Sequence, residues 1–252
     1  MSGFGPLVRK ELLEQWRTSR LAVVAVVFAL IGLGSPLLAR FTPEILKAAG
    51  GNQFQIVLPT PTAADAVDQL LKNTGQFGGL IAVLLAMGSV ATEKERGTAA
   101  LLLATSASRA AYLVAKLVAI GTTLAIGVAV AAAGAWFYTL VLFEQLPVPG
   151  FAAAALLVWL SLLAYASITF LGSVLTRSAI AAAGLGVAAF IVLGIVSIVP
   201  EIGRYLPTGL GAPARALALG LPADVAGPMV VTIAIVVALV VLGWVAFRRQ
   251  EL

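Results

Sequence analysis

Six apolar runs divide the chain, and short polar segments separate them. A helix needs about 20 apolar residues to cross the hydrocarbon core of a bilayer. Four runs have this length, one (77–91) is shorter, and one (112–143) is long enough to tilt or to project beyond the bilayer. The pattern predicts an all-α integral membrane protein with six transmembrane helices. The runs are residues 21–39, 77–91, 112–143, 151–175, 179–199 and 227–247.

The composition supports a lipid environment. Of the 252 residues, 61% are hydrophobic and 11% are charged. A soluble domain carries roughly 25% charged residues, because water must solvate its surface. The chain has no Cys and no His, which excludes disulfides and Cys/His zinc sites. We expect no metal site on this chain.

The basic residues cluster beside the apolar runs and indicate a topology. Cytoplasmic loops of membrane proteins carry an excess of Lys and Arg. With the N-terminus inside, the inner segments hold eleven basic residues and the outer loops hold five, so we predict that both termini are cytoplasmic. We read the net charge of +5 as this topology signal and not as a nucleic-acid interface. We expect Lys116 near the inner end of its span, within snorkelling reach of the interface. The inner basic residues are Arg9, Lys10, Arg17, Arg20, Lys94, Arg96, Arg109, Lys116, Arg177, Arg248 and Arg249, and the outer ones are Arg40, Lys47, Lys72, Arg204 and Arg215.

The first 20 residues have an amphipathic pattern, with apolar residues at helical spacing and charges between them. Such a helix lies in the membrane interface, with a tryptophan at headgroup depth. We therefore divide the chain into an interfacial helix, residues 1–20, and one six-helix transmembrane domain, residues 21–252. A plain extension of the first span is the alternative. The interfacial helix is defined by Lys10, Glu11, Trp16 and Arg17.

Two outer loops have structure of their own. The first, residues 40–75, contains a short helical pattern over 63–71, in which Asp68 and Lys72 form an i,i+4 pair. The last, residues 200–226, contains four prolines among several glycines. It is too broken for a span and too apolar for a free loop, so we expect a re-entrant or interfacial segment.

Several activities are excluded by residues that are missing. No charged residue lies in the central part of any span, whereas an ion-coupled carrier generally needs such a group. The sequence has no phosphate-binding loop, so we expect no ATP hydrolysis by this chain and classify it as a non-enzyme. Most polar residues in the spans are small hydroxyls that can bond their own helix. The candidates to line a pathway are Gln76, Phe77, Ser89 and Ser197.

The first inner loop, residues 93–109, is the most informative segment. It consists of a charged helix end, a glycine, a short apolar run and a basic return into the next span. Leu101, Leu102 and Leu103 give it an apolar surface that no soluble domain covers, and such surfaces usually have a partner. In the alternative, the charges are ordinary juxtamembrane residues and the leucines dip into the interface.

This loop resembles the first cytoplasmic loop of ABC type-2 permeases, which has the pattern E-x-E-x-G-T, an apolar run, then Ser-Arg and Lys. The opening Lys10, Glu11 and Leu12, with Trp16 and Arg17, also resembles the amphipathic helix of that family. The resemblance covers essentially the whole chain. It departs at residues 106–109, where the family often has a proline before Ser-Arg, and this leaves the local turn open.

The resemblance implies a permease subunit that docks a separate ATP-binding subunit through the loop. The coupling residues would be Glu93, Glu95, Arg96, Gly97, Thr98, Leu101, Leu102, Leu103 and Arg109.

We therefore expect an ATP-driven exporter of a lipid-like or amphipathic substrate, working as a homodimer in the cell inner membrane. No cofactor is expected on this chain, and ATP and Mg²⁺ would bind the partner subunit. A periplasmic accessory protein is a further candidate partner, and the lipid bilayer surrounds the spans. Two rival functions stay open: a membrane scaffold that transports nothing, and an energy-independent channel or carrier.

Overall fold

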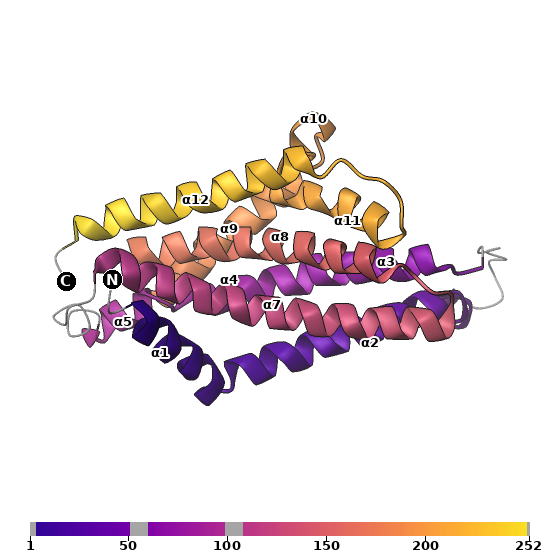
Figure 1. Ribbon diagram of the computed structural model, residues 1–252, viewed down its shortest axis with the longest axis horizontal. Coiled ribbons are helices and arrows are strands. Elements are labelled where there is room, and N and C mark those ends of the chain that lie inside the picture. Colours follow the sequence, from indigo (N-terminus) through magenta and orange to yellow (C-terminus); the bar gives the residue numbers. More distant parts are fainter. Residues whose placement is uncertain (1–3, 51–59, 99–107, 251–252) are drawn as a thin grey trace.

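The computed structural model describes residues 4–50, 60–98 and 108–250, which form an elongated helical bundle without a β-strand in these ranges (Figure 1). Six helical segments are long and apolar enough to cross a membrane. This confirms the predicted all-α fold with six membrane-spanning helices. The segments are Arg20–Ile45, Ala63–Glu95, Arg109–Leu142, Val148–Leu175, Ala179–Val196 and Ala226–Arg248.

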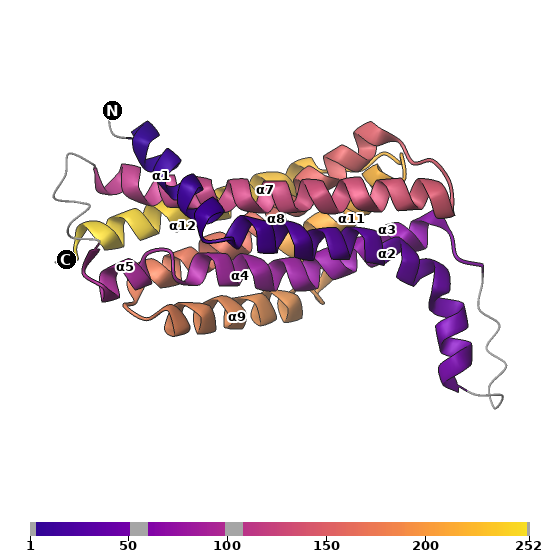
Figure 2. The ribbon, with the colours of Figure 1, turned by 90° about the horizontal axis from the view of Figure 1, so that it is seen from below.

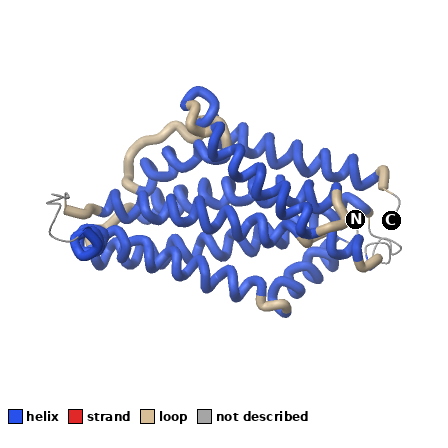
Figure 3. Tube along the Cα trace, turned by 180° about the vertical axis from the view of Figure 1, so that it is seen from behind, coloured by secondary structure: helices blue, strands red, loops and turns tan. Residues whose placement is uncertain are grey.

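Most of the long helices run roughly along the long axis of the bundle, whereas the N-terminal helix is inclined to it (Figures 1 and 3). Helix α1 (Phe4–Arg17), helix α5 (Ala91–Glu95) and the end of α12 (Ala226–Arg248) lie together at one end (Figures 1 and 2). We call this the α5 end and the opposite one the α11 end. An even number of spans brings both ends of the chain to the same end of the bundle. That the α5 end faces the cytoplasm stays a prediction.

The centre of the bundle consists of α7 (Arg109–Leu142) and α8 (Val148–Leu175), each of which has 14 buried residues. Helix α2 (Arg20–Gly50) packs closely on α7. A Cβ atom at Gly32 would lie 2.3 Å from the carbonyl oxygen of Ala131. Small residues at such crossings let two helix backbones approach each other, which is how membrane helices associate without a hydrophobic driving force between them.

The second span begins earlier than the sequence indicated. Helix α3 (Ala63–Asn73) continues through a π-helical turn, η2 (Thr74–Gly78), into α4 (Gly79–Met87) and, after a short turn, into α5. The predicted helix over 63–71 is confirmed as α3, but it continues into the second span and is not confined to the outer loop. The polar stretch around Asn73 does not end the helix, because the side chain of Asn73 donates to the buried Ser35 hydroxyl at 3.0 Å.

The connection between the last two spans is folded onto the bundle. Helix α9 (Ala179–Val196) covers only the part of the bundle toward the α5 end (Figure 2). The chain then forms α10 (Pro200–Gly203), a 3₁₀ turn η3 (Pro207–Leu210) and α11 (Gly211–Ala218), which packs on α8. The buried Leu210, Ala214 and Ala218 make this segment part of the core, and it is not a free loop.

An ion pair fastens α11 to α3. The guanidinium of Arg215 contacts the carboxylate of Asp68, and both side chains are about half exposed. The predicted pairing of Asp68 with Lys72 is therefore wrong. Spacing along one helix indicated the i,i+4 partner, whereas the fold supplies a stronger donor from 147 residues away.

Two spans are largely exposed in this single chain. Only Ala182 and Gly186 of α9 are buried, and α12 buries few residues. Exposed aliphatic side chains cover the outer faces of both helices. In a membrane, such faces contact lipid or another protein.

Candidate functional site

A buried ion-pair cluster lies at the α5 end. The Lys116 ammonium of α7 lies 2.7 Å from Glu93 Oε1 of α5 and 3.2 Å from both carboxylate oxygens of Glu11 of α1. Only 3% of the Lys116 side chain is exposed. We expected Lys116 to snorkel toward the interface, and the structure shows a buried side chain that joins three helices. The two carboxylates compensate the buried charge, which would be strongly destabilising without them.

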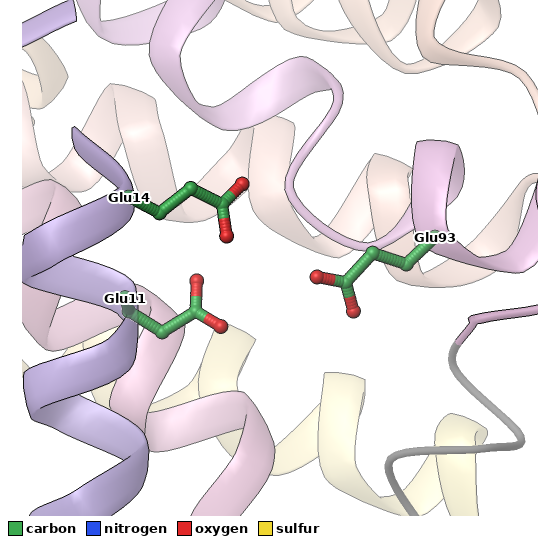
Figure 4. Close-up of side chains that lie close together, drawn as sticks. All are labelled: Glu11, Glu14 and Glu93. Atoms are coloured by element: carbon green, nitrogen blue, oxygen red, sulfur yellow. The ribbon is translucent and has the colours of Figure 1, made fainter. Parts of the chain in front are cut away.

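Three carboxylates converge in this cluster, from Glu11 and Glu14 of α1 and from Glu93 (Figure 4). Their oxygens lie within 4.8 Å of one another, which is close enough to hold a cation. Two ammonium groups already bridge them, because Lys10 contacts all three carboxylates at 2.9–3.5 Å and Lys116 contacts two. We therefore interpret the cluster as an ion-pair network that fixes α1.

The charge state of Lys10 follows from these contacts. Its partial burial lowers the pKa of the ammonium, but the hydrogen bond to Glu11 and the charges of Glu11, Glu93 and Glu14 raise it more. The pKa of Lys10 therefore lies above its ordinary value, and the side chain is charged at neutral pH. Tyr112 completes the network by donating its hydroxyl proton to Glu93.

The start of α5 is held by α8. The Ser173 hydroxyl accepts hydrogen bonds from the backbone N–H groups of Val90 and Ala91, at 3.0 and 2.9 Å. The Lys94 ammonium donates to the Val174 carbonyl at 2.6 Å and to the Gln250 side chain at 3.1 Å. These bonds satisfy buried backbone groups at the ends of α5 and α8 that have no partner within their own helix.

Beyond α5 the chain becomes exposed. Glu95 and Arg96 are exposed and form no ion pair with any described residue. Gly97 has a φ of +71°, which glycine adopts without strain, and it ends the helix. Thr98 follows, with its hydroxyl 3.3 Å from the Glu93 carbonyl oxygen. Because residues 95–98 are exposed, they are available to a partner.

The chain re-enters the bundle at Arg109, after the Ser108 hydroxyl caps α7. One guanidinium nitrogen of Arg109 donates to the carbonyls of Phe247, Arg248 and Gln250, at 2.9, 2.9 and 3.2 Å. Arg109 therefore caps the end of α12, where the last carbonyls have no helical partners. Both ends of the loop make hydrogen bonds with the end of α12. Lys94 contacts Gln250, and Arg109 contacts the last carbonyls of the helix.

The predicted site residues separate into groups. Glu93, Lys10 and Glu11 meet in the cluster, and Arg109 lies at the same end. On α1, Trp16 is 71% exposed and Arg17 is exposed, away from the cluster. The apolar residues Leu101, Leu102 and Leu103 lie outside the described residues, so their docking role stays a prediction.

The four candidate pathway residues do not come together. Gln76 and Phe77 are exposed in η2, Ser89 lies toward the α5 end, and Ser197 ends α9. Ser89 and Ser197 donate to the carbonyls of Ala86 and Gly194 in their own helices. This confirms the expectation of local hydrogen bonding, which most hydroxyls in the spans follow. Others that do so include Ser35, Thr122, Thr123, Ser167, Thr169 and Thr232.

Sequence reasoning missed the partners of the loop. Ser173 and Gln250 lie far from the motif in sequence, and Tyr112, although it lies within three residues of Arg109, is connected with α5 by no local spacing. One signal was present: Lys116 is a charged residue within a long apolar run, and such a residue usually has a specific partner.

The sequence matches the family described as ABC-2 family transporter protein over residues 6–252. The chain belongs to the ABC-2 family of transporter proteins. It is also similar to an uncharacterized transmembrane protein of Bacillus subtilis (strain 168), YxlG, with 31% identity over 255 residues that cover 97% of each chain. The resemblance drawn from the loop motif is thus confirmed at the level of the family, and the chain is a membrane transport subunit.

Proposed function

We propose that this chain is the permease subunit of an ATP-driven exporter, and that a separate ATP-binding subunit docks at its α5 end. One observation carries the proposal. The described residues on either side of the loop, Lys94 and Arg109, both make hydrogen bonds with the end of α12, in a chain that has few charged residues. Membership in the ABC-2 family supports an ATP-binding partner. The 252 residues contain no phosphate-binding loop, so ATP and Mg²⁺ would bind that partner.

The contacts of Lys94 and Arg109 would transmit a displacement of the loop into the bundle. A displacement of the loop would act on α5 and α7 together, because both ends of the loop are hydrogen-bonded to the end of α12. The contact of Glu93 with Lys116 and Glu11 would carry the same displacement into α1. Packed helices change arrangement as rigid elements. A partner can shift the transporter between two states only if its contacts differ between them, and the loop supplies such contacts.

The substrate class and the assembly follow from the apolar surfaces. A lipid-like or amphipathic substrate suits a chain that is 61% hydrophobic and that has few charges in its spans. We propose a homodimer in which exposed faces of the bundle meet, and the aliphatic surface of α9 is available for it. The proposed location is the cell inner membrane, with the α5 end and both termini in the cytoplasm.

The test is co-expression with a candidate ATP-binding subunit in a cell membrane. We expect equal amounts of the two chains after purification, and ATP hydrolysis that requires the pair. The chain expressed alone should hydrolyse no ATP. A chain that is folded and stable but captures no ATP-binding subunit would contradict the proposal and favour a membrane scaffold.

A further inference from the structure

A cavity lies beside the π-helical turn, on the side of the bundle that α9 covers. It has a volume of about 290 Å³ and lies between η2, α8, α9 and η3. Ligand sites in proteins have volumes from about 300 Å³ upward, are mostly apolar, and carry a few polar groups that fix orientation. The cavity has this character, because Leu162, Phe190 and Val158 line it together with a small number of polar side chains.

Three features keep the cavity open. Gly75, Gly194 and Gly211 line it, and a Cβ atom on any of them would meet no atom within 4 Å. The Ser161 hydroxyl donates to the Pro207 carbonyl at 2.9 Å and fixes η3 against α8. The π-helical turn displaces the chain between α3 and α4, and such turns occur frequently at functional sites. An edge-to-face pair of Tyr165 and Phe190, with ring centroids 5.0 Å apart, forms one wall.

The polar groups on the cavity are unused. The Thr208 hydroxyl is buried and has no hydrogen-bond partner among the described residues. The Tyr165 hydroxyl and the Gln76 amide also form no hydrogen bond within the described part of the chain, unlike most hydroxyls of the spans. A buried polar group without a partner is costly, so a ligand that supplies a partner for the Thr208 hydroxyl would be bound favourably. The exposed Gln76 amide is available to the same ligand.

The positive charge beside the cavity favours a ligand with a negative charge. Lys72 lines it and forms no ion pair with any described residue, because Asp68 pairs with Arg215. None of the described residues that line it carries a carboxylate. We propose that this cavity binds an amphiphile with an anionic head, with the acyl chain along Leu162 and Phe190 and the head toward Lys72, Gln76 and Thr208. The inference rests on the proposed function, since it specifies the class of substrate.

The test uses a palmitic acid that carries a photoactivatable diazirine, compared with the corresponding hexadecanol. The purified chain is placed in phosphatidylcholine nanodiscs without ATP. We expect stronger labelling by the acid than by the alcohol, and labelled peptides from α8, α9 or η3. Replacing Lys72 with Gln should remove this preference, which should be roughly threefold for a partly exposed charge pair.

A matched pair of glycine variants tests the location. Gly194→Leu fills the cavity, whereas Gly184→Leu adds the same side chain to another open position of α9, away from the cavity. Leucine has a higher helix propensity than glycine, so both variants should fold. We expect Gly194→Leu to lose most of the labelling and Gly184→Leu to keep it. Equal labelling by acid and alcohol in the unmodified chain, or equal labelling of the two variants, would overturn the inference.

Two further measurements distinguish a phospholipid from a free fatty acid, and the cavity proposal from the proposed function. Adding phosphatidylglycerol to the nanodiscs competes with the label if a resident anionic phospholipid is the ligand, and does not compete if the ligand is a free fatty acid; both results require an anionic amphiphile. Capture of an ATP-binding subunit is measured in parallel. Failed labelling with normal capture would reject the cavity alone, and normal labelling without capture would reject the proposed function alone.

Discussion

The Lys116 ammonium lies 2.7 Å from a carboxylate oxygen of Glu93, and this pair joins the third span to the start of the loop between the second and third spans. Glu11 approaches the same ammonium from α1, so the N-terminal helix, α5 and α7 share one buried charge. In our account the pair has two roles. It holds α1 on the bundle, and it transmits displacements of the loop.

Removing the buried charge should destabilise the protein strongly. Lys116→Met leaves Glu11 and Glu93 without their buried partner, which costs about 3–5 kcal/mol. The measurement is thermal unfolding in detergent. Arg177→Met, which removes an exposed charge at the same end of the bundle, should change the unfolding free energy by less than about 0.5 kcal/mol. The double variant Lys116→Met, Glu93→Gln should recover part of the loss. Equal effects of Lys116→Met and Arg177→Met would refute the buried pair.

The cap on α12 should be visible in hydrogen exchange. Arg109→Gln removes the guanidinium that bonds three carbonyls at the end of α12, so the last turn of that helix should fray. We expect faster amide exchange over residues 244–250 and little change elsewhere. Arg109→Lys should protect this turn partly, because it keeps the positive charge near the helix end. Unchanged exchange in Arg109→Gln would show that α12 does not depend on this contact.

Two neighbouring glycines of α2 should respond in opposite ways. Gly32→Ala places a Cβ atom against the Ala131 backbone and should cost at least about 1–3 kcal/mol, because backbone cannot move aside as a flexible side chain can. Gly34→Ala meets no atom within 4 Å and should be neutral or stabilising by up to about 1 kcal/mol. The check is the unfolding midpoint of both variants. A stable Gly32→Ala would mean that α2 and α7 are farther apart than described.

The spans could be predicted from the sequence because the hydrocarbon core of the bilayer requires predominantly apolar residues along each spanning helix. The partners of polar side chains could not be predicted, because they depend on how helices pack. Asp68 illustrates this: its local spacing indicated Lys72, and the fold placed Arg215 beside it. Lys116 has a partner 105 residues away, in Glu11, that no pattern within its own span reveals. The sequence indicates an outer loop as far as residue 75, because the buried Ser35 that accepts from Asn73 belongs to another helix and no local pattern reveals it.

The topology can be measured with introduced cysteines, since the native chain has none. Thr98 and Glu201 are both exposed and lie in segments predicted to face opposite sides. With a membrane-impermeant maleimide on intact cells, we expect Glu201→Cys to react and Thr98→Cys to react only after the membrane is opened. The excess of basic residues at the α5 end is the physical reason. Labelling of Thr98→Cys in intact cells would reverse the assignment.

The central claim is that an ATP-binding subunit docks on the first inner loop. Leu102→Asp tests it by placing a charge in the proposed interface, and Ser178→Asp is the control. Ser178 is an exposed helix cap in another connection at the same end, and aspartate is also a good cap. Burial of one leucine contributes about 1.5–3 kcal/mol, and an unpaired buried charge costs several kcal/mol more.

The decisive measurement is therefore the amount of ATP-binding subunit that co-purifies with each variant, with membrane insertion verified in both. Our account predicts normal insertion for both chains, a loss of binding well beyond tenfold for Leu102→Asp, and normal binding for Ser178→Asp, since 1.4 kcal/mol already corresponds to a factor of about ten. Normal capture of the ATP-binding subunit by Leu102→Asp would contradict the account.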